Sequence, residues 1–535
     1  MAFLVSPGVE VKEIDLTNVV PAVSTSIGAV AGNFRWGPVE QVTTVGSEKE
    51  LVSNFGKPNA TNYMSFYNAA TFLQYGNNLK VYRGVGAGAV NAVSGTDSGD
   101  AAILVKNADH YDTLTIANTG EFIAKYPGLL GNSLKVVVIT PASWGVDSDA
   151  TSVVYQAQFD AAPSAGEMHI LVLDEDGELS GVAGTVLEKF EYVSTTSTAK
   201  TADGASNYYA NVVNRSSRWI WAGDAAPSLT SVVDLEYSLV GGVDVAPASV
   251  SALYSTAFGD SEIIDVQLLI GGAVSSSDAN VIIAVADSRK DCVAFVSPEI
   301  ADTVGTTTPE ADVLAWANAI NSSSYGVLDS GAIYVYDKYI DAYHWVGAAG
   351  SVAGLCANTD DVADAWFSPA GFTRGVLRGV TKLAFNPTQA NRDNLYKARV
   401  NPIASFPGQG VVLYGDKTAQ TKPSAFDRIN VRRLFITLEK AISTAAKFQL
   451  FEFNDEFTQA QFRNLVEPFL RDVQGRRGLT DFAVICDETN NTAAVVDTNR
   501  FVADIYIKPA RSINFITLNF IATRSGVEFS EIVGQ

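Results

Sequence analysis

Residues 405–418 read SFPGQGVVLYGDKT and combine three glycines with a Lys-Thr pair, which are the residue types of a phosphate-binding loop. Such a loop follows a strand and opens a helix, so that N–H groups at the helix N-terminus point at the anion. Here Gly408 and Gly410 precede the apolar run VVLYG, and Lys417 follows it in a polar passage broken by proline. This order favours a structural turn over a nucleotide site.

A second glycine run, Gly84, Gly86 and Gly88, follows the strand-like LKVYR and is better placed for a dinucleotide-binding fold. It lacks the third glycine at the required spacing. It also lacks a following helix, because NAVSGTDSGD is a poor helix former. We interpret the run as a linker.

The titratable residues indicate no catalytic or metal site. His110, His169 and His344 share no metal-ligand spacing, and His344 in DAYHWVG is typical of a packed loop residue. Asp287 ends the apolar run VIIAVAD, which we expect to be a strand, and α/β enzymes place catalytic acids at such ends. Its polar and basic neighbours favour a capped or ion-paired loop instead. We predict no catalytic residue, cofactor or metal ion.

Three cysteines, Cys292, Cys356 and Cys486, lie far apart in apolar runs. Their odd number and spacing favour buried thiols in a reducing compartment over a disulfide framework. The N-terminus has no basic leader, and no apolar run reaches the length of about 18 residues that a membrane-spanning helix needs. We therefore expect a protein made in a cytoplasm, without insertion into a membrane.

The densest basic site is RDVQGRRG, with Arg471, Arg476 and Arg477 after a helical pattern. Cations suit a helix C-terminus and the solvent, which is one interpretation. A docking patch for an acidic protein partner is the other, and the sequence leaves both open.

The elements that position these residues follow an α/β rhythm. The chain of 535 residues is long enough for three or four domains. Strand-like and helix-like runs alternate over residues 21–85 and again after about residue 245, whereas the stretch between has short alternating runs such as SLKVVVIT, MHILVLDEDGEL and FEYVST. We predict a mixed α/β multidomain chain with a mostly β insert.

The last 160 residues contain the strongest helix patterns, FDRINVRRLFITLEKAISTAAKF and FTQAQFRNLVEPFLRDVQG, with Ser424 or Asp427 as possible caps of the first. Three strand runs follow, DFAVICD, RFVADIYIKPA and RSINFITLNFIAT. The last is apolar on both faces, so it needs a partner strand on each edge, from its own chain or from a neighbour.

Charge is unevenly distributed. The formal net charge is -21, which disfavours nucleic acid or an anionic membrane as the main partner. Residues 376–535 contain 20 Lys and Arg against 16 Asp and Glu, a net charge of +4, whereas residues 96–245 contain 7 against 20, a net charge of -13. The insert is acidic and the C-terminal part mildly basic.

Several passages together resemble the tail sheath proteins of contractile-tailed bacteriophages, in particular the T4-like branch. They are VSPGVEVKE (5–13), AGNFRWGPV (31–39), FLQYGNNLKVYR (72–83), YPGLLGNSLKV (126–136), DVQLLIGG (265–272), AGLCANTDDVADAWFSPAGFTRG (353–375), YGDKTAQTKPSAFDRINVRRLF (414–435) and KPARSINFITLNFIAT (508–523). The resemblance spans nearly the whole chain and is weakest from about residue 96 to residue 240.

The resemblance implies a structural protein rather than an enzyme. Its subunits would stack as six-fold rings around a tail tube and contract on infection, driving the tube through the host envelope for genome ejection. The implied partners are further copies of the chain, the tail tube protein, and the baseplate and tail terminator proteins. The implied location is the virion tail, after assembly in the host bacterial cytoplasm.

The implied architecture is an α/β core built from the N- and C-terminal parts, with the insert facing outward. We expect an N-terminal arm (1–20), a middle α/β domain (21–95 plus 245–375), an acidic outer insertion domain (96–244), an inner C-terminal α/β core domain (376–510) and a C-terminal arm (511–535). The connection after VYRGV is short, so this chain is expected to lack one outer domain of the longest T4-like relatives.

In the relatives both arms add strands to sheets of neighbouring subunits. The resemblance therefore implies inter-subunit joints at Val9, Val11, Ile513, Phe515, Leu518 and Phe520. The basic end is expected to face the tube, with tube or inter-subunit contacts at Arg471, Arg476, Arg477, Lys440 and Lys447.

Three alternatives remain. Within the family, the chain could belong to a phage-derived contractile injection particle such as a tailocin. An α/β enzyme is the alternative from a different class. The acidic insert could also bind a host surface or glycan, although its sequence has no stacked-aromatic or metal-binding signature.

Overall fold

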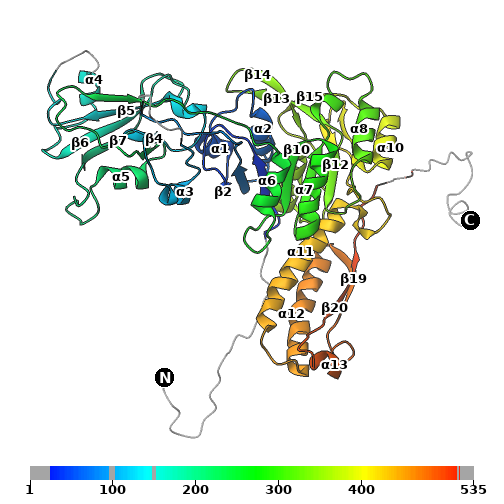
Figure 1. Cartoon of the computed structure of the whole chain (residues 1–535). Helices are drawn as coiled ribbons and strands as arrows, with labels where there is room; N and C mark the ends of the chain where they lie inside the picture. Colours follow the sequence, from blue (N-terminus) through cyan, green and yellow to red (C-terminus); the bar gives the residue numbers. More distant parts are fainter. Residues whose placement is uncertain (1–23, 96–102, 147–151, 515–516, 518–535) are drawn as a thin grey trace, which may run out of the picture. The chain divides into compact units, whose positions relative to one another are not determined.

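The computed structural model describes residues 24–95, 103–146, 152–514 and 517. The chain divides into two compact units: one comprises Val20–Leu450, and the described part of the other begins at Phe451. Figure 1 shows helices and strands in both units. The predicted mixed α/β multidomain class is confirmed.

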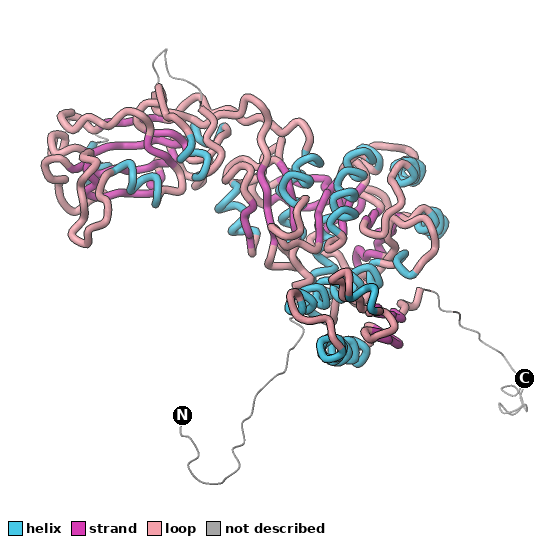
Figure 2. The backbone as a smooth tube through the Cα atoms, turned by 60° about the horizontal axis from the view of Figure 1, so that its bottom comes forward, coloured by secondary structure: helices cyan, strands magenta, loops and turns pink. Residues whose placement is uncertain are grey.

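A seven-stranded sheet forms the centre of the larger unit (Figure 2). Its order is β16-β12-β11-β10-β1-β3-β2, and all neighbours pair in parallel except β2, which is antiparallel to β3. The strands are β1 (Gly28–Gly32), β2 (Val42–Val45), β3 (Leu79–Arg83), β10 (Leu268–Ala273), β11 (Val293–Ser297), β12 (Gly326–Asp329) and β16 (Val400–Asn401). Segments far apart in the sequence thus share one sheet, which extends past residue 375.

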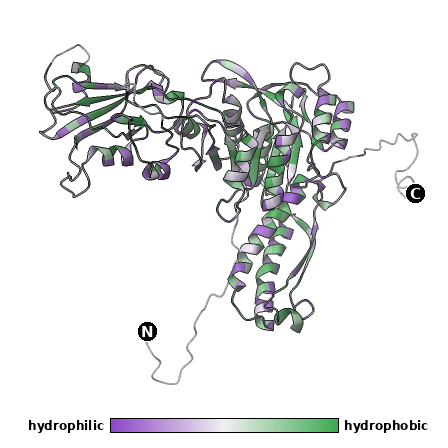
Figure 3. Ribbon diagram, viewed as in Figure 1, coloured by the Kyte–Doolittle hydropathy of each residue, from purple (hydrophilic) through white to green (hydrophobic). Residues whose placement is uncertain are grey.

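Helices cover this sheet in two packed pairs, α2 with α9 and α6 with α7. Every residue of β1 and β11 is buried, so both faces of these strands are covered, as their continuous apolar runs predict. Figure 3 shows the middle of the central sheet mostly in the hydrophobic colour. The helices of this layer are α1 (Glu48–Phe55), α2 (Tyr63–Phe72), α6 (Val250–Phe258), α7 (Ser276–Arg289), α8 (Pro309–Asn318), α9 (Ala349–Val362) and α10 (Gln389–Lys397).

The predicted strand at residues 281–287 is wrong, because this run lies inside helix α7. The Ser275 side chain caps the helix by accepting a hydrogen bond from the Asp278 N–H at 3.2 Å, and Lys290 ends it with a φ of +65°. A short apolar run fits a buried strand and a buried helix equally well, and only the cap at Ser275 distinguishes them.

Residues 103–240 supply a separate antiparallel sheet of order β7-β6-β5-β9, with its own apolar core, and a two-stranded sheet, β4-β8. The elements are α3 (Ala108–Thr113), β4 (Phe122–Ala124), β5 (Leu134–Ile139), α4 (Ser152–Gln156), β6 (Glu167–Asp174), β7 (Thr185–Ser194), α5 (Tyr209–Ser216), β8 (Ile220–Ala222) and β9 (Leu235–Ser238). The runs SLKVVVIT, MHILVLD and FEYVS lie in β5, β6 and β7, as predicted.

Arg83, at the end of β3, ties the central sheet to the start of the insert. Its guanidinium is fully buried and donates to the carbonyl oxygens of Phe34, Gly37 and Pro127 at 2.8, 2.8 and 2.7 Å. Burial lowers the pKa of Arg83 to about 10, and the nearby Asp244 carboxylate opposes this shift. One side chain thereby fixes the chain on both sides of the glycine-rich connection.

The rest of the larger unit contains two small antiparallel sheets and the long helix α11. The sheets are β14-β13-β15, from β13 (Ala332–Asp337), β14 (Ala342–Gly347) and β15 (Val380–Leu383), and the hairpin β17 (Ile403–Phe406) with β18 (Gly410–Leu413). Helix α11 spans Ile429–Ala446 with Arg428 at its N-cap position. The predicted caps are wrong, because the Ser424 side chain instead accepts from the Phe426 N–H and begins a short 3-10 helix. The 3-10 turn separates the two cap candidates from the first turn of α11.

The smaller unit packs helix α12 against a two-stranded antiparallel sheet. Its elements are α12 (Glu456–Gly475), β19 (Leu479–Ile485), α13 (Ala493–Val496) and β20 (Asp504–Pro509). Pro468 lies inside α12, and the apolar positions Phe462, Leu465, Val466 and Val473 are buried, as the helical spacing predicts.

Candidate functional site

The glycine-rich segment at residues 405–418 is a hairpin turn followed by a strand, as predicted. Gly408 and Gly410 have φ values of +74° and +79°, the left-handed region that such turns need. The Lys417 ammonium donates to the Tyr396 carbonyl oxygen at 2.7 Å. The lysine is therefore bound within its own chain, and the segment is structural.

The second glycine run is a tightly packed connection. A Cβ on Gly86 would lie 2.2 Å from the Ala246 carbonyl oxygen, and the Gly86 N–H donates to the Val245 carbonyl at 2.8 Å. Gly86 therefore lets the chain that leaves the central sheet lie directly against the chain that returns to it.

The remaining candidates for chemistry have structural partners. Asp287, on helix α7, accepts a hydrogen bond from the Ser323 hydroxyl at 2.8 Å. His344 lies in strand β14, not in the loop we predicted, where its ring stacks on Tyr63 with centroids 4.6 Å apart and its Nε2 is 3.4 Å from the Asp337 carboxylate.

Within the described ranges, no group of three or more His, Cys, Asp or Glu side chains is arranged to hold a metal ion. No helix in this part of the chain is long and apolar enough to cross a membrane. The three thiols are buried and free, as expected, and burial raises the pKa of Cys356 to about 12 and of Cys486 to about 11.

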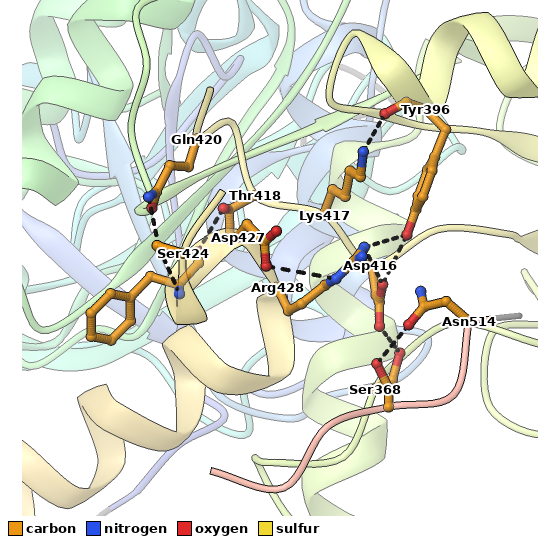
Figure 4. A network of polar contacts seen from close by, with 12 residues as sticks. Ser368, Tyr396, Asp416, Lys417, Thr418, Gln420, Ser424, Asp427, Arg428 and Asn514 are labelled. Atoms are coloured by element: carbon orange, nitrogen blue, oxygen red, sulfur yellow. Dashed lines mark hydrogen bonds and ion pairs between the residues drawn. The ribbon is translucent and has the colours of Figure 1, made fainter. Parts of the chain in front are cut away.

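A polar network around the buried Asp416 carboxylate fixes the start of helix α11 (Figure 4). Asp416 accepts a hydrogen bond from the Ser368 hydroxyl at 3.1 Å, and Arg428 forms an ion pair with the Asp416 carboxylate at 3.3 Å. Arg428 also donates to the Tyr396 hydroxyl, and the Ile429 N–H donates to the Asp416 carbonyl. Burial, with the Asp416 charge second, raises the pKa of Tyr396 to about 12.

Two arginines on the first turns of α11 continue this anchorage. Arg432 stacks on Phe426 and Tyr325, with its guanidinium carbon 4.0 and 4.3 Å from the two ring centroids. Arg433 donates to the Asp360 carboxylate of helix α9 at 2.6 Å, and both side chains are buried. The contacts that anchor the start of α11 were not predicted from the sequence. Arg432 and Arg433 lie between the apolar positions Val431 and Leu434, where helical spacing predicts solvent-facing residues, so no sequence signal marks their burial.

A buried carboxyl at the end of strand β12 is a further residue that sequence analysis missed. Asp329 accepts hydrogen bonds from the Ser297 hydroxyl at 2.6 Å and from the Gly331 N–H at 2.9 Å. Burial raises the pKa of Asp329 to about 7, and these hydrogen bonds oppose the shift. The Ser297 hydroxyl also accepts from the Ala349 N–H, so the group connects β11, β12 and the first turn of α9.

The predicted basic contacts fall into two groups. In the larger unit, Lys440 forms an ion pair with Asp265, whereas Lys447 is exposed at the end of α11. In the smaller unit, Arg471, Arg476 and Arg477 are all exposed at the C-terminal end of α12, where Arg476 lies 3.7 Å from Asp472. The structure therefore brings the three arginines together on one helix end.

The sheet β19-β20 has two strands, and no third strand pairs with it among the described residues. Its register runs from Leu479 opposite Pro509 to Ile485 opposite Asp504. Two-stranded sheets are marginal alone, and an unpaired edge offers N–H and C=O groups to another strand. The edges of this sheet could therefore accept a further strand.

The predicted arm residues are mostly outside the described part of the chain. The residues outside it are Val9, Val11, Phe515, Leu518 and Phe520. Ile513 is described, is exposed and lies after β20 in a segment without regular structure.

Three sequence models of one family match the chain. They are the tail sheath protein Gp18 domain III N-terminal region (residues 25–83), the phage tail sheath protein central domain (265–419) and the phage tail sheath C-terminal domain (421–523). The residues between 83 and 265 lie outside these matches.

Two relatives that align over their full length are also tail sheath proteins. The tail sheath protein of Vibrio phage KVP40 is 33% identical, over 99% of this chain and 100% of the relative. That of Enterobacteria phage T4 is 30% identical, over 99% of both. Among solved structures, a sheath tail protein from Listeria innocua has a TM-score of 0.58 at 14% identity, covering 92% of this chain and 93% of that one. The helical sheath of the anti-feeding prophage in its contracted state has a TM-score of 0.53 at 14% identity, covering 97% and 99%.

Fold, site and relatives together define a structural component of a contractile phage tail, and not an enzyme. The chain belongs to the phage tail sheath protein family, in its T4-like branch. Its place is the tail sheath of the virion.

Proposed function

We propose that copies of this chain stack as six-fold rings around a tail tube and contract to drive the tube through the host envelope during genome ejection. The single observation that carries the assembly is the two-stranded sheet β19-β20, which has no third strand among the described residues. Membership of the sheath family supports the proposal that neighbouring copies complete that sheet.

The proposed joints are strand additions at β19 and β20. An N-terminal arm with Val9 and Val11 from one neighbour and a C-terminal arm with Ile513, Phe515, Leu518 and Phe520 from another would each add a strand. Main-chain hydrogen bonds give such joints affinity that depends little on side chains. Arms of this kind allow neighbouring subunits to pivot while they stay connected.

Contraction in this proposal needs no nucleotide. The extended sheath is a trapped assembly, held by contacts with the tube and the baseplate, and it releases free energy as each subunit gains contacts with its neighbours. Two ion pairs anchor the start of α11, Asp416–Arg428 and Arg433–Asp360. They would keep this helix fixed to the rest of the larger unit while subunits turn.

The basic residues are proposed as contacts to the tube or to other subunits. Arg471, Arg476, Arg477 and Lys447 are exposed, and exposed charges exchange partners at modest cost. Lys440 has an ion pair with Asp265, so it would have to give up this partner to bind another.

Domain roles follow from the same proposal. Residues 1–20 and 511–535 would serve as arms, residues 21–95 plus 245–375 as the middle domain, residues 376–510 as the inner core domain, and residues 96–244 as an outward insertion.

The alignment with the Vibrio phage relative runs over 680 residues, more than the 535 of this chain. The relative thus has segments that this chain lacks, which supports the loss of an outer domain.

The proposed partners are other copies, the tail tube protein, the baseplate and the tail terminator protein. Neither nucleic acid nor insertion into a membrane enters the proposal.

A sheath from a phage-derived injection particle is the second candidate, because the anti-feeding prophage sheath shares the fold. The higher identity to phage sheaths favours the phage, and neighbouring capsid genes would decide between the two.

Negative-stain electron microscopy of the purified chain, across a range of concentrations, tests the proposal. We expect long tubes or stacked rings, with the contracted form as the low-energy product. A chain that stays monomeric, also after the tube protein is added, would contradict the proposed assembly.

A further inference from the structure

The N-terminal end of helix α12 carries an exposed aromatic surface. Phe451, Phe453 and Phe457 each expose 75% or more of their side-chain surface. Soluble proteins rarely gather large apolar side chains on one exposed site without a partner. We call these residues the aromatic tip.

Carboxylates surround the aromatic tip. Glu452, Asp455, Glu456 and Glu488 are exposed at the same end of the smaller unit, and Asp455 caps α12 by accepting from the Thr458 N–H at 2.9 Å. The Glu488 carboxyl contacts Glu456, and this contact raises the pKa of Glu488. Two carboxyls this close repel each other when both are ionised, and a bound cation would relieve that repulsion.

The opposite end of the same helix is basic. Helix α12 has 20 residues, and such a helix is about 30 Å long. Arg471, Arg476 and Arg477 are exposed at its C-terminal end. A helix dipole favours acidic residues at the first turn and basic ones at the last, but it explains neither three exposed phenylalanines nor the Glu456–Glu488 contact.

We propose that the aromatic tip and its carboxylates bind the arginine cluster of a second copy of this chain. A guanidinium can bridge two carboxylates and stack on an aromatic ring at the same time, which an ammonium cannot do equally well. The two surfaces differ, so the contact joins copies head to tail. Contacts of that type propagate into helical assemblies when they do not close into a ring.

This inference rests on the proposed self-assembly and names one of its contacts. A metal ion is the weaker occupant, since the described residues contain no cluster of three potential ligands. The tail tube protein is the other macromolecule that could cover the tip, and the experiment below separates it from a second copy.

The test uses charge reversal in the full-length chain. One variant combines Glu456→Arg with Glu488→Arg, a second combines Arg471→Glu with Arg476→Glu, and a third carries all four changes. We expect each pair of changes to lower the assembled fraction in sedimentation roughly tenfold, and the four changes together to restore most of it. Equal mixtures of the first and second variants should also co-assemble.

A control for the second variant, Lys200→Glu with Arg215→Glu, makes the same charge change at exposed positions of the insert and should assemble like the wild type. If charge reversal prevents folding, Glu456→Gln with Glu488→Gln gives a milder version with the same direction of effect. Wild-type assembly without any response to these changes would overturn the inference and leave the proposed function intact. Normal assembly with lost binding of added tube protein would assign the tip to the tube and also overturn it.

Discussion

Arg433 of helix α11 and Asp360 of helix α9 form an ion pair at 2.6 Å in which the two side chains are only 4 and 6% exposed. Arg433 also donates to the carbonyl oxygens of Cys356 and Thr25, so its charge is held by several acceptors at once. A buried ion pair that keeps additional hydrogen bonds fixes the direction in which a helix leaves its domain. The start of α11 is therefore held rigidly against helix α9.

Removing one partner of this pair should be costly. Arg433→Met leaves Asp360 buried without its cation, and we expect a loss of roughly 3–5 kcal/mol in the free energy of unfolding. Urea denaturation followed by circular dichroism measures it. The matched control is Lys447→Met on the exposed end of α11, with an expected change within about 0.5 kcal/mol. A loss below about 1 kcal/mol for Arg433→Met would show that the pair does not anchor the helix.

Substitution of Arg83 should lower the free energy of unfolding by a similar amount, because three carbonyl oxygens accept hydrogen bonds from its guanidinium. Arg83→Met leaves the Phe34, Gly37 and Pro127 carbonyls without their donor, and we expect about 3 kcal/mol or more of lost stability. Faster limited proteolysis in the connection after residue 83 should accompany it. Arg35→Met removes a surface ion pair with Glu178 and serves as the control, expected to stay near wild type.

Asp329 predicts a pH dependence of stability. Its pKa is about 7 in the folded chain, against about 4 for an unfolded carboxyl. The folded state therefore binds the proton more tightly, and the stabilisation present below about pH 4 is lost as the pH rises through 7. The difference in stability between wild type and Asp329→Asn should fall by up to about 1.4 kcal/mol per pH unit over this window.

Chemical denaturation at a series of pH values checks this dependence. Asp109→Asn removes an exposed carboxylate and is the control. A stability difference that does not vary between pH 4 and pH 7 would refute the role of Asp329.

The three thiols should be inert in the folded chain. Cys292, Cys356 and Cys486 are buried and their pKa values are raised, so little thiolate forms at pH 8. Titration with a thiol reagent should detect fewer than one group in the native protein and three after unfolding. Rapid modification of the native protein would contradict this.

Apolar patterning predicted much of the fold, and it did so where burial alone decides the structure. Residues 293–297 and 134–139 form the buried strands β11 and β5, and the helical spacing of apolar residues in 457–475 correctly predicted α12. The strand predicted at residues 281–287 was wrong because the length and composition of this apolar run fit both a strand and a helix.

The anchoring residues were not predictable for a different reason. Arg433 and Asp360 are 73 residues apart, and Arg83 reaches Pro127 across 44 residues. A single sequence shows charged residues but not which of them will meet in a low-dielectric interior, because that depends on the packing of distant elements. The Arg471, Arg476 and Arg477 cluster was predictable because its members are close in sequence and share one helix end.

Deleting residues 1–20 tests the central claim, that neighbouring copies join by strand addition, most directly. Circular dichroism and thermal melting would establish that residues 21–535 fold as the full chain does, and electron microscopy with sedimentation would measure assembly at matched concentrations. We expect a folded monomer that forms no contractile sheath. Normal polymerisation of the deletion variant would contradict it.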